Sequence, residues 1–228
     1  MAKELRKLLA GFRRFREQYF EPEDSIYRKL AREGQNPKTL VIGCSDSRVD
    51  PSLLSAASPG ELFIVRNVAN LVPPFEKGGG LHGVSAAIEF AVVNLKVENI
   101  VVLGHRQCGG IRALVEINEN TPKNFVTEWV KIAMPARKKI MKTHPHAQGD
   151  SLVTLCELES VKVSLLNLQT FPFVQEALAE GRLRLVGAYF DLESGELLEL
   201  NQENGEFEAI DLEQLKTTTQ KELDTDQT

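Results

Sequence analysis

Two stretches of this chain carry residue types that bind soft metal ions. Cys44-Ser45-Asp46-Ser47-Arg48 supplies one thiol, and His105-Arg106-Gln107-Cys108-Gly109-Gly110 supplies an imidazole and a second thiol. Two thiolates and an imidazole form a ligand set that suits Zn²⁺. A structural zinc usually has four protein ligands, whereas three obvious ones are present here, which leaves one position for water. Cys44, His105 and Cys108 are therefore predicted to hold a catalytic zinc.

Asp46 and Arg48 follow the first cysteine closely. Charged side chains that come directly after a buried strand need partners, and each of these two can pair with the other. The planar guanidinium of Arg48 stays charged and can hold a carboxylate through two hydrogen bonds, which a lysine cannot do. The pair is a candidate for acting on whatever the metal binds.

Both stretches follow short apolar runs rich in β-branched residues, Leu40-Val41-Ile42-Gly43 and Ile100-Val101-Val102-Leu103-Gly104. Such runs, ended by glycine, are typical of fully buried strands. If the two strands are parallel, their carboxyl ends open onto the same edge of the sheet, where α/β proteins build their sites. Parallel pairing would therefore bring the three predicted ligands together.

The rest of the chain alternates predicted strands and helices. Further strands are expected at residues 62–66 and 183–190, and helices near residues 81–95, 124–143, 151–168 and 173–180, with a break at Pro135. This alternation indicates an α/β fold with a mainly parallel β-sheet flanked by helices. No linker or repeat divides residues 1–228, so one domain is expected. Residues 1–34 are predicted to form a projecting amphipathic helical arm, and residues 212–228 a polar tail.

Composition narrows the possible partners. The chain has 228 residues, 42% of them hydrophobic and 26% charged, with a net charge of −5. This balance favours neither nucleic acid nor a membrane as partner, and no apolar run is long enough to span a bilayer. Three cysteines do not make a disulfide framework, and the basic N-terminus lacks the apolar segment of a secretory signal. A cytoplasmic protein is expected.

Three motifs together resemble those of the β-class carbonic anhydrases, zinc enzymes that interconvert carbon dioxide and bicarbonate. They are C-x-D-x-R from Cys44, R-N-x-A-N from Arg66 and H-x-x-C-G-G from His105. The similarity runs from about Gln35 to Leu197. It implies that Cys44, His105 and Cys108 bind one zinc per subunit, and that hydroxide on this zinc attacks carbon dioxide. Asp46 and Arg48 would be the catalytic dyad that orients the attack.

The resemblance also implies which residues contact the substrate. Gln35 occupies the place of a substrate-contacting glutamine in the plant-like branch of the family, and Gly109 that of a backbone amide facing the site. The residues that match that branch's carbon dioxide pocket are Phe63, Val68 and Phe90. The branch with an inhibitory bicarbonate site carries a Trp where this chain has Val41, which favours an open, uninhibited site. Arg106 and Gln107 depart from the family, which usually has smaller residues there.

Assembly and pH dependence follow from the same resemblance. The helical arm of the family packs on a neighbouring subunit and the site lies at a dimer interface, so a homodimer or a dimer of dimers is expected. Two thiolates cancel the charge of Zn²⁺, so the water should ionise nearer to the roughly 9 of aqueous zinc, and activity should rise with pH. Asp46 could either accept a hydrogen bond from the hydroxide or bind the metal itself at low pH; the sequence leaves both open.

Other functions remain as alternatives. The same site could act on carbon disulfide or a similar small molecule, or the zinc could belong to a structural subunit without turnover. A redox-active pair formed by Cys44 and Cys108 is disfavoured, because thiols bound to zinc are protected from oxidation.

Several conspicuous residues are predicted to have structural roles only. His82, His144 and His146 are expected at the surface, His82 also at an interface. Cys156 is expected in the core, and Arg66-Asn67 is expected to hold the loop at the site.

Overall fold

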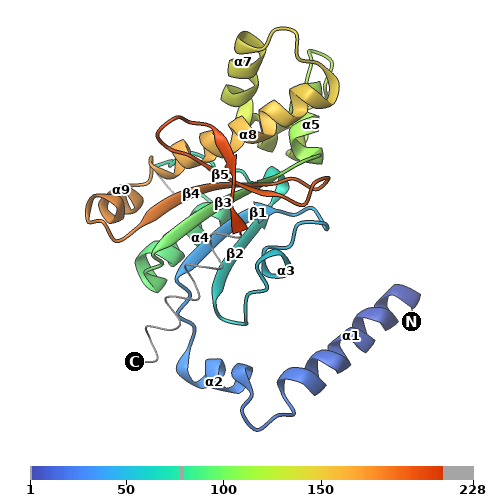
Figure 1. Cartoon of the computed structure of the whole chain (residues 1–228), viewed down its shortest axis with the longest axis vertical. Helices are drawn as coiled ribbons and strands as arrows, with labels where there is room; N and C mark the ends of the chain where they lie inside the picture. Colours follow the sequence, from blue (N-terminus) through green and yellow to red (C-terminus); the bar gives the residue numbers. More distant parts are fainter. Residues whose placement is uncertain (1, 78–79, 213–228) are drawn as a thin grey trace.

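A six-stranded sheet forms the centre of the described part of the chain, which comprises residues 2–77 and 80–212 of a computed structural model (Figure 1). The strands are β1 (Thr39–Cys44), β2 (Leu62–Asn67), β3 (Asn99–His105), β4 (Arg184–Phe190), β5 (Leu197–Leu200) and β6 (Phe207–Ala209). Their order is β2-β1-β3-β4-β5-β6. The first four are parallel, and β5 and β6 add two antiparallel pairings at one edge. The predicted mainly parallel sheet is confirmed.

The described helices lie beside this sheet or pack on one another, except the first, which projects away (Figure 1). They are α1 (Lys3–Tyr19), α2 (Ile26–Glu33), α3 (Pro51–Ser55), α4 (Gly83–Glu89), α5 (Gly109–Glu116), α6 (Phe125–Val130), α7 (Met134–Thr143), α8 (Gly149–Leu168) and α9 (Pro172–Ala179). Three short helical turns also occur in the described residues, η1 (Val68–Asn70), η2 (Phe90–Leu95) and η3 (Lys131–Ala133).

Two of the predicted helices are interrupted. The segment expected at 124–143 divides into α6, η3 and α7, and Pro135 lies in the first turn of α7. Proline lacks a backbone N–H, so it can begin a helix but disrupts the interior of one, as predicted. The segment expected at 81–95 begins as α4 and ends in the π-helical turn η2, where the N–H of Lys96 bonds to the carbonyl of Ala91. Apolar spacing does not separate these two kinds of helix.

The larger core lies between the sheet and α8. Alternate residues of β1 and β3 face it, because side chains of a strand alternate between the two faces. The buried residues Leu40, Ile42, Ile100 and Val102 pack there with Val161 and Leu168 of α8, among others. The opposite face carries a smaller buried cluster of Val41, Leu103 and Ala188. Both faces of the central strands are therefore apolar, as their unbroken β-branched runs predict.

The N-terminal arm projects from the rest of the subunit (Figure 1). None of the described residues of α1 is buried, and Leu5, Leu8, Leu9 and Phe12 remain exposed. An aromatic cluster joins the end of α1 to α2 and comprises Phe15, Tyr19, Phe20 and Tyr27. The apolar stripe of the arm is thus left exposed by the described residues of its own subunit.

Three further observations concern the arm, the end of the chain and its surroundings. Ser25 caps α2 by accepting a hydrogen bond from the N–H of Arg28 at 3.3 Å. The predicted polar tail lies, from residue 213 onward, outside the described residues. Among the described helices, none combines the length and apolarity needed to cross a membrane.

A prediction for stability concerns Gly104, which separates the strand core from His105. A Cβ built there would lie 2.7 Å from Cγ2 of Val161 and 3.4 Å from Cδ2 of Tyr189. We expect Gly104→Ala to lower the free energy of unfolding by about 1–3 kcal/mol, because overpacking forces α8 away from the sheet. Urea denaturation measures this value.

The matched control is Gly83→Ala in α4, where an added Cβ meets no described atom within 4 Å. Its stability should be unchanged or slightly raised, because alanine favours the helix. Equal stabilities for the two variants would contradict close packing of α8 on β3.

Candidate metal centre

Cys44, His105 and Cys108 meet at the carboxyl edge of the sheet. Gly43 of β1 pairs with Leu103 of β3 in parallel register, so Cys44 and His105 end adjacent strands. Cys108 follows after a short loop and precedes α5. The three ligand atoms lie within 4.8 Å of one another, and all three residues are buried. The structure therefore assembles the predicted ligands without any rearrangement.

The geometry of this cluster fits a zinc ion. The two Sγ atoms are 4.0 Å apart, close to the about 3.8 Å that a tetrahedral site with usual Zn–S bonds requires. Nδ1 of His105 lies 2.8 Å from the carbonyl oxygen of Arg106, and since a carbonyl only accepts, Nδ1 carries the proton. The buried Nε2 is then a bare acceptor and has no hydrogen-bond partner among the described residues. A bound metal ion would satisfy this nitrogen.

The electrostatics of the cluster favour one thiolate even before a metal binds. The hydrogen bond from the Cys108 thiol lowers the pKa of Cys44 despite its burial, with help from His105. The same contact, together with burial, raises the pKa of Cys108. Burial alone would lower the pKa of His105, but the Cys44 thiolate outweighs it, so that pKa is raised. One negative charge is thus already present where a cation would bind.

A buried carboxylate holds the backbone of Cys108 in place. Glu157 of α8 accepts a hydrogen bond from the backbone N–H of Cys108 at 2.7 Å and another from the hydroxyl of Tyr189 at 2.8 Å. Burial raises the pKa of Glu157. This residue was not predicted from the sequence; the available signal was a glutamate directly after the mainly apolar run 152–156 of α8.

Arg66 holds the loop that follows Cys44. Its side chain donates to the carbonyls of Cys44 at 2.9 Å and Asp46 at 2.7 Å, and to the carboxylate of Asp50 at 2.8 Å. Asn67 closes the next turn through hydrogen bonds to both backbone groups of Leu71. The predicted role of Arg66-Asn67 in holding the site loop is confirmed.

Asp46 and Arg48 form a bidentate pair beside the cluster. Nε of Arg48 donates to Oδ1 of Asp46 at 3.0 Å and Nη2 donates to Oδ2 at 2.8 Å. These hydrogen bonds hold the pKa of Asp46 well below its usual range. Asp46 is ionised at neutral pH, and it does not belong to the group of potential metal ligands found in the described chain.

Val68 and Gly109 also lie at this edge. Val68 directly follows β2, whose last residue, Asn67, pairs with Cys44. Its position is close to α5, because a Cβ on Gly110 would lie 2.8 Å from its Cγ1. Trp129 donates its indole N–H to the carbonyl of Val68 at 2.7 Å. Trp129 is remote in sequence, so no local pattern indicates this contact.

Gln35, Phe63 and Phe90 lie elsewhere in the same subunit. Gln35 is exposed and precedes β1, whereas Cys44 ends that strand. Phe63 pairs with Leu40, four residues before the end of β2, and a strand rises about 3.3 Å per residue. Phe90 stacks near Phe63, with ring centroids 5.8 Å apart. These three residues therefore do not line the metal centre of their own chain.

The remaining conspicuous residues stay outside the centre. His82, His144 and His146 are exposed, and Cys156 is fully buried in an apolar cluster, as predicted. Burial raises the pKa of Cys156 to about 11, so it remains a thiol at neutral pH.

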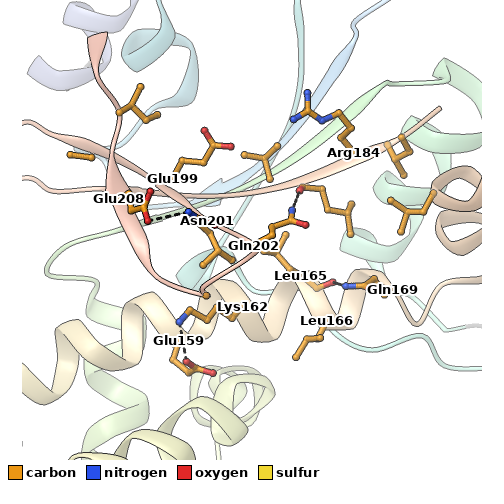
Figure 2. A pocket seen from close by; sticks show the side chains of 18 of the residues that line it. Glu159, Lys162, Leu165, Leu166, Gln169, Arg184, Glu199, Asn201, Gln202 and Glu208 are labelled. Carbon is orange, nitrogen blue, oxygen red and sulfur yellow. Dashed lines mark hydrogen bonds and ion pairs between the residues drawn. The ribbon is translucent and has the colours of Figure 1, made fainter. Parts of the chain in front are cut away.

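Two large hollows of the described chain lie away from the ligands. One, of about 920 Å³, lies between α8 and the β5–β6 hairpin (Figure 2). In it Glu159 pairs with Lys139 at 2.8 Å and lies 3.7 Å from Lys162. The other, of about 1090 Å³, is lined mainly by apolar residues of other segments, among them Phe171 and Phe173. Neither contains a metal-ligand cluster among the described residues.

Comparison with known proteins agrees with this centre. Residues 39–197 match the carbonic anhydrase family. The chain belongs to this family. A carbonic anhydrase of Synechococcus elongatus is 36% identical over 210 residues, covering 91% of this chain and 75% of the relative.

Solved structures place it in the β class of carbonic anhydrases. The β-carbonic anhydrase CcaA has a TM-score of 0.84 and 34% identity, and the match covers 92% of this chain and 93% of that one. A tetrameric β-carbonic anhydrase of Sordaria macrospora has a TM-score of 0.78 and 28% identity, with 88% and 98% covered.

Metal binding by this carbonic anhydrase can be tested by substitution. We expect Cys44→Ser and Cys108→Ser to lose zinc, because each removes a thiolate from a site with three protein ligands. Zinc content by mass spectrometry, and the sulfur-to-metal absorption band of the cobalt-loaded protein, measure the loss.

Cys156→Ser is the matched control, because Cys156 is a buried thiol outside the cluster. This variant should keep one zinc per chain and the full absorption band. If Cys156→Ser lost zinc while Cys44→Ser and Cys108→Ser kept it, the metal would bind outside the predicted cluster.

Proposed function

We propose that this carbonic anhydrase catalyses the reversible hydration of carbon dioxide to bicarbonate and a proton, with zinc held by Cys44, His105 and Cys108. The observation that carries the proposal is the buried ligand cluster with the ionised Asp46–Arg48 pair beside it. When bound, zinc supplies the Lewis acidity that makes water a nucleophile near neutral pH. The remaining chemistry falls to the residues of the chain.

Asp46 is proposed to orient the attacking hydroxide. An ionised carboxylate can accept a hydrogen bond from the nucleophile and would thereby orient it toward the carbon of carbon dioxide. Arg48 engages both oxygens of Asp46 and keeps the carboxylate charged. This arrangement supports the first of the two roles considered for Asp46, because a carboxylate held in this way is not free to bind the metal.

The substrate pocket is proposed to form between two subunits. Val68 and the backbone amide of Gly109 come from the chain that holds the metal. Gln35, Phe63 and Phe90 come from the partner subunit, since in their own subunit they lie toward the other end of the strands. The amide of Gln35 would donate a hydrogen bond to an oxygen of carbon dioxide or bicarbonate. A homodimer, or a dimer of dimers, is therefore the proposed unit.

Two observations support this assembly. The apolar stripe of α1 is exposed in the single subunit, and burial of such a stripe favours association. The Sordaria macrospora relative is described as tetrameric. We further propose an enzyme of the plant-like branch with an uninhibited site, on the basis of Gln35 and of Val41 in place of Trp. A cytoplasmic location is also proposed, because free cysteines suit a reducing compartment.

The proposed role of the Asp46–Arg48 pair can be tested by substitution. We expect Asp46→Ala to lower kcat/KM for carbon dioxide hydration about a hundredfold, because the nucleophile loses its orientation. Arg48→Lys should lower it about tenfold, since an ammonium cannot reproduce the planar two-point contact. Stopped-flow hydration of the zinc-loaded protein measures both, and wild-type activity should rise from pH 6.5 to 9.

Asp150→Ala is the control, because Asp150 forms an exposed ion pair with Arg112 at 2.8 Å. It should keep wild-type activity. A wild-type protein that turns over carbon disulfide but not carbon dioxide would refute the proposed substrate. A flat pH profile of the wild-type activity would refute the expectation that two thiolates make the zinc a weaker Lewis acid.

A second prediction concerns the arm. Leu8 and Phe12 are exposed in the single subunit, so Leu8→Glu combined with Phe12→Glu should not unfold it. We expect this double variant to shift the protein toward monomer and to lose hydration activity in parallel, because the pocket is then incomplete. Light scattering coupled to size exclusion, with the hydration assay, measures both.

Met141→Glu in α7 places the same charge on another exposed apolar residue and should leave the oligomer intact. Full activity from a monomeric arm variant would show that one subunit suffices.

A further inference from the structure

Arg48 has hydrogen-bonding contacts beyond Asp46. Its Nη2 donates to the backbone carbonyl of Gln107 at 3.2 Å, and its Nη1 lies 3.5 Å from the side-chain Oε1 of Gln107, at the long end of the hydrogen-bond range. Gln107 lies in the loop between His105 and Cys108. The guanidinium therefore links the loop after Cys44 to the loop between His105 and Cys108.

Gln107 is in turn held by the turn between β4 and β5. Its Nε2 donates to Oε1 of Glu193 at 2.8 Å. Arg106 bonds to the other oxygen of Glu193 at 2.9 Å and to Asp191 at 2.9 Å. Asp191 accepts from the backbone N–H of Glu193 at 2.8 Å, which fixes the turn. We call Arg106, Gln107, Asp191 and Glu193 the turn clamp.

The backbone at Gln107 indicates that this conformation is maintained by its surroundings. Its φ is +57°, in the left-handed region that glycine and asparagine adopt more readily than glutamine. Such a residue costs free energy unless the neighbouring structure over-determines it, and these residues concentrate at functional sites. The contacts of the Gln107 side chain with Glu193, and of its carbonyl with Arg48, provide that determination.

We propose that Gln107, held by Glu193, is a positioning residue for Arg48, so that the β4–β5 turn controls the geometry of the Asp46–Arg48 pair. The inference rests on the proposed function and deepens it. The side chain of Arg48 is 48% exposed, so the guanidinium end of the ion pair retains contact with solvent, which weakens such pairs. A second anchor restricts the guanidinium, and with it the carboxylate that orients the nucleophile. Arg106 and Gln107, which are larger than the residues that the resemblance leads one to expect, thus help to hold Arg48 in position.

The test compares Gln107→Gly and Glu193→Ala. Glycine accepts the positive φ and keeps the backbone carbonyl, so Gln107→Gly removes only the side chain. We expect each variant to lower kcat/KM for carbon dioxide hydration about three- to tenfold, the scale of one hydrogen bond to a charged network. Zinc content and melting temperature should stay unchanged. Glu193→Gln retains an oxygen that can accept from Gln107 and should restore most of the activity.

Coupling to Arg48 separates positioning from a general structural role. In an Arg48→Lys background, Gln107→Gly should have little further effect, because Gln107 acts through the guanidinium. Glu98→Ala is the matched control, since Glu98 forms an exposed ion pair with Lys38 at 2.7 Å at the opposite end of the strands. It should leave kcat/KM unchanged.

The outcomes distinguish this inference from the proposed function. An active wild type whose kcat/KM is unaltered by Gln107→Gly and Glu193→Ala would overturn the inference alone. Additive losses in the Arg48→Lys background would also overturn it, because they assign the effect to folding. A zinc-loaded wild type that does not hydrate carbon dioxide would overturn the proposed function, and with it the catalytic role of the turn clamp.

Discussion

Parallel pairing of β1 with β3 is the constraint on which the metal centre depends. Because Gly43 pairs with Leu103, the strands end together, and the residues that leave them, Cys44 and His105, emerge side by side. An antiparallel pairing would send the two strand ends to opposite edges of the sheet. The buried β-branched runs that stabilise the strands thus also determine the positions of the ligands. Gly104, close to Val161 of α8, shows how little room this packing leaves beside His105.

Around the ligands, backbone polar groups that a sheet would normally pair are satisfied by side chains. Arg66 bonds to the carbonyls of Cys44 and Asp46, and Glu157 bonds to the N–H of Cys108. Unpaired polar groups in a buried site carry a large free-energy cost, so these contacts allow irregular loops to replace strand. Cys44 and His105 end their strands, and the loop after β3 can then bring the second thiol, that of Cys108, beside them. Nε2 of His105, a ligand atom, is one of three buried side-chain atoms that have no hydrogen-bond partner in the described chain.

The sequence predicted the centre better than its surroundings, for a physical reason. Ligands and strands are encoded locally: a β-branched run predicts a strand, and a cysteine after it predicts where the thiol emerges. Glu157, Trp129 and Glu193 reach the site through tertiary packing, and no spacing in the chain indicates which loop each will contact. The sheet register likewise decides that Phe63 lies opposite Leu40, toward the other end of β2 from the metal ligands. The resemblance identified Phe63 as a pocket residue, but it did not show that Phe63 lies away from the metal ligands of its own subunit.

The pairing of charges at the sheet edge affects how strongly the site can retain an anion or an uncharged molecule. Arg48, Arg66 and Arg106 each pair with a carboxylate, so their charges are largely neutralised close to where they arise. Zinc bound by Cys44 and Cys108 as thiolates would also be formally neutral. The site therefore offers no strong positive field to retain an anion such as bicarbonate, and carbon dioxide itself is uncharged. Such an edge suits a reversible reaction, because release of the product does not require a strong ion pair to be broken. Control then lies in geometry, in how firmly the guanidinium of Arg48 holds one carboxylate in place.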